Sequence, residues 1–329
     1  MPSALVAPDS FKGTFDAPTV AAALARGLER AGWQAEQCPV ADGGEGTLAI
    51  LVAALGGECV AARASDPLGR PIECSFGVAG STAIVELAQA SGLGLVAPGE
   101  RDAWAASTRG TGELILAAAA SGAEEILVAV GGSAATDGGA GAIEAIHAGG
   151  GLGAARLVVL CDVEAAFEDA PRIFGPQKGA DVATVARLEG RLERLARQLP
   201  KDPRGVRATG CAGGLSGGLW AVFDAELRPG AAAVLDALGV DARIRPAQLV
   251  VAGEGCLDAQ SFGGKVVGEL ARRSRAAGTA VHTVVGSSEL DEEDWTRRGL
   301  ASVRTASTLD EIQVAGHELG ASIRPSARR

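Results

Sequence analysis

The chain has few aromatic and few basic residues. Tyrosine is absent, aromatic residues make up 3% of the 329 residues, and lysine plus arginine number 30 against 40 acidic residues. The formal net charge is therefore -10. Nucleic-acid binding usually depends on a basic surface and on aromatic rings that stack on bases. The composition argues against a nucleic-acid partner.

Long apolar runs and clustered cysteines are also missing. No stretch reaches the roughly 18 apolar residues that a membrane-spanning helix needs. The N-terminal sequence lacks the basic and apolar segments of a signal peptide, so we expect a cytoplasmic protein without a membrane partner. The six cysteines form no Cys-x-x-Cys pair, which argues against a zinc site or a disulfide framework. With only three histidines, catalysis would depend on carboxylates, lysine, hydroxyls and backbone amides.

Glycine is abundant and lysine is scarce. The chain has 47 glycines, about twice the usual share, and they cluster beside acidic and hydroxyl residues. Three of its four lysines have a glycine as direct neighbour, namely Lys12, Lys178 and Lys265. A compact ammonium group beside open backbone suits phosphate binding. This pattern favours a phosphate site, with chance pairing as the alternative.

The order of predicted elements indicates an α/β fold with largely parallel sheets, because strands and helices alternate at both ends of the chain. Short β segments joined by turns follow Glu58 and indicate a second domain. We predict a Rossmann- or flavodoxin-like domain from residues 1–62 and 246–329, and an inserted second α/β domain from residues 63–245. The predicted strands are 4–7, 38–40, 84–87, 126–130, 157–160, 248–252, 281–285 and 301–304. The predicted helices are one between the Asp16 cap and Gly32, then 47–55, 111–120, 142–147, 181–199, 266–277 and 308–319.

Acidic residues and glycines follow most of the predicted strands. Carboxylates can bind Mg²⁺, while hydroxyls and backbone amides can bind phosphate oxygens. Any one of these loops would more often cap a helix or form a tight turn. Together they predict a magnesium–phosphate site at the carboxyl edge of parallel sheets. The loops are Pro8–Gly13, Asp42–Gly46, Gly131–Gly139, Asp162 and Gly253–Asp258.

Two segments of the chain partly match nucleotide-binding signatures. A P-loop is disfavoured because Gly264-Lys265 is followed by Val266 instead of Ser or Thr. The segment 44–49 fits the dinucleotide pattern Gly-x-Gly-x-x-Ala, which leaves an NAD-dependent oxidoreductase as an alternative. Asp42 and Glu45 would repel the pyrophosphate at that position, and this weakens the alternative. A related protein that binds without catalysis is a third class.

Seven motifs occur in the same order as in a known enzyme family, over nearly the whole chain. They are Val6–Gly13, Ala41–Thr47, Asp66–Pro71, Thr108–Glu113, Gly131–Ser133 with Asp137–Gly141, Phe174–Ala180, and Gly253–Gly255 with Asp258 and Gly264-Lys265. In combination they resemble the bacterial type I glycerate kinase family. Two departures are a shorter segment before the strand that precedes Asp162, and Ala135-Thr136 where the family often has Thr-Asn.

The resemblance implies ATP-dependent phosphorylation of D-glycerate with Mg²⁺, at the 2-hydroxyl to give 2-phosphoglycerate. It also implies an active-site cleft between two α/β domains and is compatible with a homodimer. A glycerate 3-kinase, or a kinase of a related small hydroxy acid, is the alternative within the same class.

The candidate site residues follow from the needs of phosphoryl transfer, which are positioning and charge neutralisation. We expect Lys12, Asp42, Asp137 and Asp162 to be catalytic, with Asp42 and Asp162 as ligands of Mg²⁺ and the choice of base left open. Lys12 and Lys178 would contact phosphate oxygens, and Arg70 or Lys12 would hold the glycerate carboxylate. The other expected substrate- or phosphate-binding residues are Asp9, Ser10, Glu45, Gly131, Gly132, Ser133, Thr136, Glu254, Asp258 and Lys265.

Overall fold

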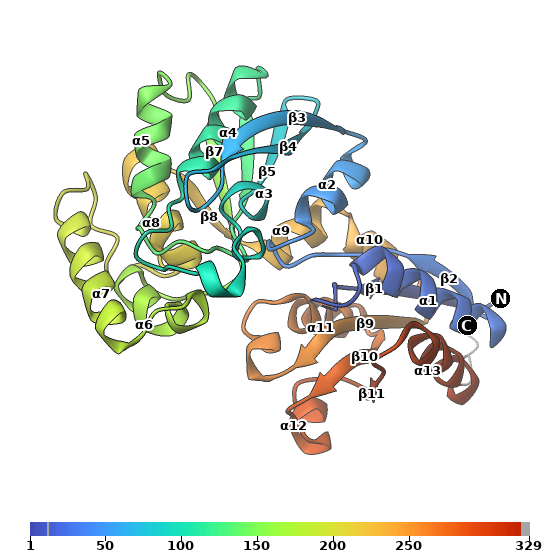
Figure 1. Ribbon diagram of the computed structural model, residues 1–329. Helices are drawn as coiled ribbons and strands as arrows, with labels where there is room; N and C mark the ends of the chain where they lie inside the picture. Colours follow the sequence, from blue (N-terminus) through green and yellow to red (C-terminus); the bar gives the residue numbers. More distant parts are fainter. Residues whose placement is uncertain (12, 324–329) are drawn as a thin grey trace. The chain divides into compact units, whose positions relative to one another are not determined.

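The computed structural model describes residues 1–11 and 13–323, and the chain forms two compact units (Figure 1). Unit 1 takes in Met1–Asp42 and Ala231–Arg329, and unit 2 takes in Gly43–Gly230. These boundaries differ from the expected ones at residues 62 and 246. The segment 43–62 belongs to unit 2 because its strand β3 (Glu58–Ser65) pairs with β4 (Pro71–Ala79). Residues 231–245 belong to unit 1 because their helices cover its sheet.

Unit 1 contains a five-stranded sheet in which every pair of neighbouring strands is parallel. Numbered along this unit, the strand order is the 2-1-3-4-5 order of flavodoxin-like folds. The chain leaves β1 toward β2 on one side, and the later strands are added on the other side, so β1 and β9 flank the topological switch point. The strands are β1 (Ser3–Pro8), β2 (Gln34–Gln37), β9 (Leu249–Leu257), β10 (Ala280–Ser288) and β11 (Ser302–Thr305).

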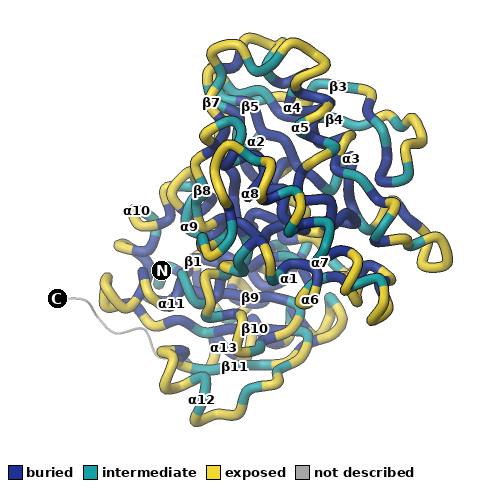
Figure 2. The backbone as a smooth tube through the Cα atoms, turned by 90° about the vertical axis from the view of Figure 1, so that its left-hand side faces the viewer, coloured by how far each residue is buried: buried dark blue, intermediate teal, exposed yellow. Residues whose placement is uncertain are grey.

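Helices cover both faces of this sheet. Alternate residues of β1 point to opposite faces, so Leu5 and Ala7 join one core while Ala4 and Val6 join the other. The first core is closed by α9 (Gly230–Ala237), α10 (Val240–Ile244) and α11 (Val266–Ala277). The second is closed by α1 (Ala17–Arg30) and α13 (Leu309–Ser322), and α12 (Glu292–Arg297) precedes β11. Figure 2 shows the central strands as buried backbone.

Side-chain caps set where the covering helices begin. Asp16 accepts a hydrogen bond of 2.8 Å from the backbone N–H of Thr19, as its position in the sequence predicted. At α13, Thr308 and Glu311 form a reciprocal capping box. These local signals explain why helix starts could be predicted within a few residues.

Unit 2 contains a six-stranded sheet of mixed direction, in the order β3-β4-β5-β6-β7-β8. The first three strands pair antiparallel, and the strands from β5 onward pair parallel. The predicted α/β class with largely parallel sheets is therefore confirmed. Besides β3 and β4, the strands are β5 (Thr82–Glu86), β6 (Glu125–Ala129), β7 (Arg156–Cys161) and β8 (Glu226–Pro229).

The main core of unit 2 lies between strands β5 to β7 and three helices. Ile126, Val128 and Leu157 are among the fully or nearly fully buried strand residues that form it. The packing helices are α4 (Arg109–Ala120), α5 (Ala140–Ala148) and α8 (Cys211–Phe223). The other helices are α2 (Thr47–Leu55), α3 (Ala88–Ser91), α6 (Ala170–Phe174) and α7 (Val182–Ala196). Short 3-10 helices are η1 (Leu93–Leu95), η2 (Pro98–Glu100), η3 (Phe167–Asp169), η4 (Pro176–Lys178) and, in unit 1, η5 (Ala259–Phe262).

The predicted secondary structure was wrong at one strand and incomplete, since α6, α8, α9, α10, α12 and β8 were not predicted. The strand expected at residues 38–40 lies at Gln34–Gln37, although the N–H groups of Cys38 and Val40 still donate to β1 carbonyls. Helix α8 was not predicted, because its four glycines are typical of a turn. Gly218 serves packing, since a Cβ there would lie 2.3 Å from the carbonyl oxygen of Gly138, whereas Gly213 and Gly214 have positive φ values of 66° and 92° at a kink in the helix. Within the described residues, no helix is both long and apolar enough to cross a membrane.

Candidate active site

A cavity of about 420 Å³ lies at the carboxyl ends of β1, β9 and β10 in unit 1. It is the position where parallel α/β sheets bind ligands, next to the switch point between β1 and β9. Six of the residues expected from the sequence line it, so the structure brings this half of the candidate site together. They are Asp9, Ser10, Asp42, Glu254, Asp258 and Lys265. Phe11, Thr14, Gly255, Cys256, Gly286 and Ser307 also line the cavity and were not expected.

Close approach of the strand ends shapes this cavity. The N–H of Asp9 donates to the carbonyl oxygen of Gly253 at 2.8 Å, which ties the loop after β1 to β9. A Cβ at Gly253 would lie 2.8 Å from the carbonyl oxygen of Val284 on β10, so a glycine is required there. Gly286 was not expected, because no acidic residue immediately follows the strand predicted at 281–285. A glycine directly after a buried strand was the signal that could have found it.

Glu254 is the most unusual residue of the cavity. Its side chain is buried, with 8% of the residue exposed, and its Oε1 atom has no hydrogen-bond partner among the described residues. Burial raises the pKa of this carboxyl to about 7, against the opposing effects of the Ser261 hydroxyl and the Lys265 charge. The nearby charges of Asp258 and Asp42 raise it further. Glu254 therefore changes protonation state near neutral pH.

Asp258 and Lys265 occupy the starts of two helical segments beside the cavity. Asp258 caps η5, accepting hydrogen bonds from the N–H groups of Gln260 at 2.7 Å and Ser261 at 3.0 Å. This capping role was the structural alternative for Asp258. Lys265 is the N-cap residue of α11, where a positive charge is unfavourable in the field of the helix. Its position favours the binding of an anion that offsets this charge.

In unit 2, Lys178 is buried against the loop that follows β6. Its Nζ donates to the carbonyl oxygen of Ala135 and, at 3.3 Å, to the hydroxyl of Thr136. Burial lowers the pKa of Lys178 to about 8, while the charges of Asp137 and Asp162 act in the opposite direction. The structure therefore places three of the expected residues, Lys178, Asp137 and Asp162, in one electrostatic environment.

Asp137 accepts hydrogen bonds with both carboxylate oxygens. The donors are the N–H groups of Thr108 at 2.9 Å, Gly139 at 3.0 Å and Gly141 at 3.2 Å, together with the hydroxyl of Thr108 at 2.9 Å. These bonds fix the starts of α4 and α5. The geometry favours a positioning role for Asp137 over the catalytic role expected from the sequence.

The glycine-rich loop after β6 is held by bonds within unit 2. The N–H of Gly131 donates to the carbonyl oxygen of Gly43, and the hydroxyl of Ser133 accepts from the N–H of Ala135 at 3.1 Å. A Cβ at Gly131 would lie 2.4 Å from the Cα of Gly44 and 3.2 Å from an oxygen of Asp162. Helix α5 begins only at Ala140, so this loop is not the first turn of a helix. Anion binding by Gly131, Gly132, Ser133 and Thr136 stays a prediction.

Two further expected residues, Arg70 and Glu45, lie elsewhere. Arg70 is held in the β3–β4 turn by Asp66, with Nε to Oδ2 at 2.5 Å, and by Glu100 at 3.3 Å. Glu45 is exposed in the loop before α2. Lys12 lies outside the described residues.

Glu86, at the end of β5, was missed by the sequence analysis. Its carboxylate accepts from the N–H groups of Gly46 at 3.1 Å and Leu48 at 2.9 Å, and burial raises its pKa. An acidic residue within an otherwise apolar strand was the available signal. Because Glu86 already binds these N–H groups, the start of α2 does not offer them to a dinucleotide pyrophosphate, which weakens the oxidoreductase alternative further.

The donor set fits a magnesium ion that arrives with a nucleotide. Across residues 1–11 and 13–323, no three His, Cys, Asp or Glu side chains are grouped as a metal site. Mg²⁺ commonly uses one or two carboxylates and takes its other ligands from phosphates and water. Asp42 and Asp162 are the two carboxylates expected from the sequence to bind it, and this role stays a prediction.

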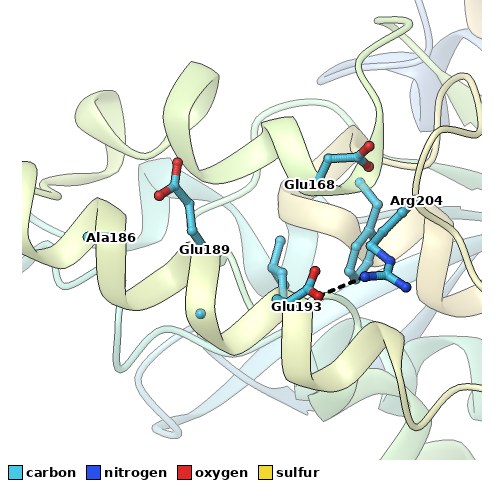
Figure 3. A pocket seen from close by; sticks show the side chains of 8 residues that line it. Glu168, Ala186, Glu189, Glu193 and Arg204 are labelled. Carbon is cyan, nitrogen blue, oxygen red and sulfur yellow. Dashed lines mark hydrogen bonds and ion pairs between the residues drawn. The ribbon is translucent and has the colours of Figure 1, made fainter.

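A second cavity, of about 460 Å³, lies in unit 2 beside α7 and η3. Figure 3 shows Glu193 paired with Arg204, at 2.7 Å, while the carboxylate of Glu189 points away from that pair. Glu168 accepts a hydrogen bond from the N–H of Gly205 at 3.0 Å. None of the residues expected from the sequence lines this cavity, and two of its acids serve local structure.

Comparison with known proteins agrees with the motifs. The sequence profile of the glycerate kinase family matches residues 4–151 and 147–318. Glycerate 2-kinase of Escherichia coli K12 is 36% identical, over 93% of this chain and 92% of that protein. Glycerate kinase of Halalkalibacterium halodurans is 34% identical, over 97% and 95%. A crystal structure described as glycerate kinase 2 of Salmonella typhimurium LT2 superposes with a TM-score of 0.81, at 32% identity and 98% coverage of each chain. The chain therefore belongs to the glycerate kinase family of enzymes.

Proposed function

We propose that the protein transfers the γ-phosphoryl group of ATP to the 2-hydroxyl of D-glycerate in the presence of Mg²⁺, forming 2-phosphoglycerate and ADP. ATP use follows from membership of a kinase family. The observation that carries the proposal is the cavity at the β1–β9 switch point, where six of the expected residues meet in a chain of this family.

The chemistry of the cavity matches a small hydroxy acid. Glycerate carries one carboxylate, which needs a cation, and two hydroxyls, which need hydrogen-bond acceptors. Lys265 provides a cation, and Asp9, Asp42 and Glu254 provide carboxylate acceptors. A cavity of about 420 Å³ lies within the usual size range of small-molecule sites and has room for a three-carbon acid and a phosphate group.

Charge neutralisation would come from unit 2 and from the metal ion. Lys178 carries a buried ammonium that can meet phosphate oxygens. When bound, Mg²⁺ would neutralise the charge that develops on the phosphates. We propose that Asp162 coordinates Mg²⁺. Its carboxylate lies beside Gly131, which has no side chain, so the backbone there leaves space next to the carboxylate.

The choice of the 2-hydroxyl is supported by one relative, which is named glycerate 2-kinase, while others are named glycerate kinase without a position. A cytoplasmic location, a homodimer and a cleft between the two units stay predictions.

The test is to incubate the purified protein with D-glycerate and ATP, with Mg²⁺ or with a chelator, and to follow ADP release. Proton-coupled ³¹P NMR then identifies the product. The phosphate of 2-phosphoglycerate couples to one proton and gives a doublet, whereas that of 3-phosphoglycerate couples to two and gives a triplet. A magnesium-dependent doublet supports the proposal, and a triplet makes the protein a 3-kinase. Turnover of lactate but not of glycerate would indicate a related hydroxy-acid kinase.

A further inference from the structure

The cavity in unit 1 contains a buried carboxylate oxygen that has no donor among the described residues. Nearly all buried polar atoms in native proteins are hydrogen-bonded, so each exception needs an explanation. Eight buried side-chain atoms lack a partner among the described residues, and Glu254 Oε1 is the one carboxylate oxygen of that set. It is also the one member of the set on a residue that lines the cavity. A ligand that carries a hydroxyl would supply the missing donor.

We infer that Glu254 accepts the proton of the glycerate hydroxyl during phosphoryl transfer, an assignment that rests on the proposed function. The acceptor hydroxyl donates a hydrogen bond to Oε1 and its oxygen attacks the γ-phosphorus. A bond forms between that oxygen and phosphorus, and the bond from phosphorus to the β–γ bridging oxygen breaks. ADP leaves with the electron pair of the broken bond. The hydroxyl proton passes to Glu254 and from there to solvent.

The other acids of the cavity are less suited to this role. Asp258 is occupied as the cap of η5. Asp9 accepts a bond of 2.6 Å from the N–H of Ser10. Asp42 follows β2, which is an edge strand, whereas Glu254 lies on β9 beside the switch point. Position and unmet hydrogen bonding therefore distinguish Glu254 from its neighbours.

The charges that face Glu254 suit a proton acceptor. Lys265, at the start of α11, favours the ionised carboxylate. Burial and the carboxylates of Asp258 and Asp42 favour the neutral form, and the Ser261 hydroxyl of η5 again favours the ionised form. The balance leaves the pKa of Glu254 at about 7, where a general base combines a large ionised fraction with useful basicity.

The first experiment compares the wild-type protein with Glu254→Gln and with Glu292→Gln, a control on the exposed surface of α12 in the same unit. We expect kcat of Glu254→Gln to fall by about 10²-fold or more. The dissociation constant of D-glycerate, measured by calorimetry, should change by less than about threefold, because the amide oxygen still accepts the hydroxyl hydrogen bond. A kcat of Glu254→Gln within about threefold of the wild type would overturn the inference.

Two measurements on the wild-type protein keep the test informative if the variant fails to fold. The kcat should rise with pH up to about 7 and then level off, because the base must be ionised. D-Glycerate should also slow alkylation of Cys256, which lines the cavity and is exposed, but should not slow alkylation of Cys59, which is exposed in β3. Equal alkylation of Cys256 with and without D-glycerate would overturn the placement of the substrate.

The outcomes separate the two proposals. If the wild-type protein phosphorylates glycerate and Glu254→Gln does so equally well, the assignment of Glu254 falls and the kinase activity stands. If the wild-type protein has no activity with glycerate and ATP, the proposed function falls, and the inference falls with it.

Discussion

Two buried carboxylates, one in each unit, differ in their hydrogen bonding. Asp137 in unit 2 and Glu254 in unit 1 are similarly buried, with 6% and 8% of the residue exposed. Asp137 is surrounded by N–H and hydroxyl donors, whereas Oε1 of Glu254 has none within the described structure. The difference indicates that unit 2 uses its acid to build loops and unit 1 leaves its acid for a ligand.

Among the described residues, two lysines, one in each unit, show the same difference in local interactions. Lys178 donates to the loop that follows β6, so its charge contributes to the structure of unit 2. Lys265 stands at the start of α11, where its charge opposes the helix field. A charge that is unfavourable in its local structure, as at Lys265, points to a ligand more clearly than a charge whose hydrogen bonds are already made within the protein, as at Lys178.

The largest effect on stability is expected from Asp137→Ala. The substitution removes the acceptor of four donors and leaves several of them buried without a partner. We expect the free energy of unfolding of unit 2 to fall by about 4 kcal/mol, because bonds to a charged acceptor are strong and orphaned donors are costly. Urea denaturation measures this, and hydrogen exchange at the starts of α4 and α5 locates it.

The matched control is the Asp137→Asn variant. Because asparagine retains one carbonyl oxygen as an acceptor, this variant should lose less stability than Asp137→Ala. If Asp137→Ala unfolded at the same urea concentration as the wild type, Asp137 would not be a structural acceptor. Its expected catalytic role would then regain support.

The substitution Glu254→Gln should change stability in the opposite direction. The folded-state pKa of Glu254 is raised to about 7 from 4.5, so the folded protein binds more protons than the unfolded chain between these values. The stability that Glu254 contributes is present below pH 4.5 and is lost as the pH rises to about 7. At pH 8, Glu254→Gln should therefore be more stable than the wild type by up to about 3 kcal/mol.

Thermal denaturation of both proteins at pH 8 and at a mildly acidic pH measures this difference. The gain should shrink toward acidic pH, where Glu254 is neutral in the wild type as well. A variant that is less stable than the wild type at pH 8 would mean that the carboxylate is paired in the folded state. Such a result would remove the contrast with Asp137.

The sequence predicted the fold best where local signals and hydrophobic periodicity agree. Helices 47–55 and 266–277 were predicted at their observed bounds, and the buried strands were found within a few residues. Helix α8 was missed because two of its glycines form a kink with positive φ, as in a turn, and Gly218 is needed for close contact with Gly138, a tertiary requirement that leaves no local sign. The β2 strand was displaced because its exposed residues lack an apolar pattern.

The candidate site was predicted by residue type but not by role. An acid beside glycine after a strand looks the same in the sequence whether it binds a ligand or caps a helix. Asp258 and Asp137 proved to be acceptors of local N–H groups, and Glu254 did not. Which donors surround a carboxylate depends on segments far apart in the chain, as for Asp137 and Thr108, and a single sequence does not specify these contacts.

A moderate loss of stability is expected from Glu86→Ala. Glu86 acts as the cap of α2 from a neighbouring strand, because Gly46 before the helix has no side chain to do so. Loss of such a cap costs about 1 to 2 kcal/mol. The change should appear in urea denaturation as a lower midpoint, and Glu86→Gln, which keeps an acceptor oxygen, should lose less. An unchanged midpoint in the Ala variant would show that the start of α2 does not need this acceptor.

The smallest effect is expected from Arg70→Ala. The sequence made Arg70 a candidate for the glycerate carboxylate, but its guanidinium contacts Asp66 and Glu100, and its side chain is 47% exposed. Ion pairs at such exposure contribute at most about 1 kcal/mol, so stability should change little.

We also expect the KM of Arg70→Ala for D-glycerate to stay within about threefold of the wild-type value, whereas loss of a direct contact with the glycerate carboxylate raises KM about tenfold or more. Steady-state kinetics with varied D-glycerate at saturating ATP decides this. A tenfold rise in KM would assign the glycerate carboxylate to Arg70, a cation of unit 2, instead of to Lys265 of unit 1.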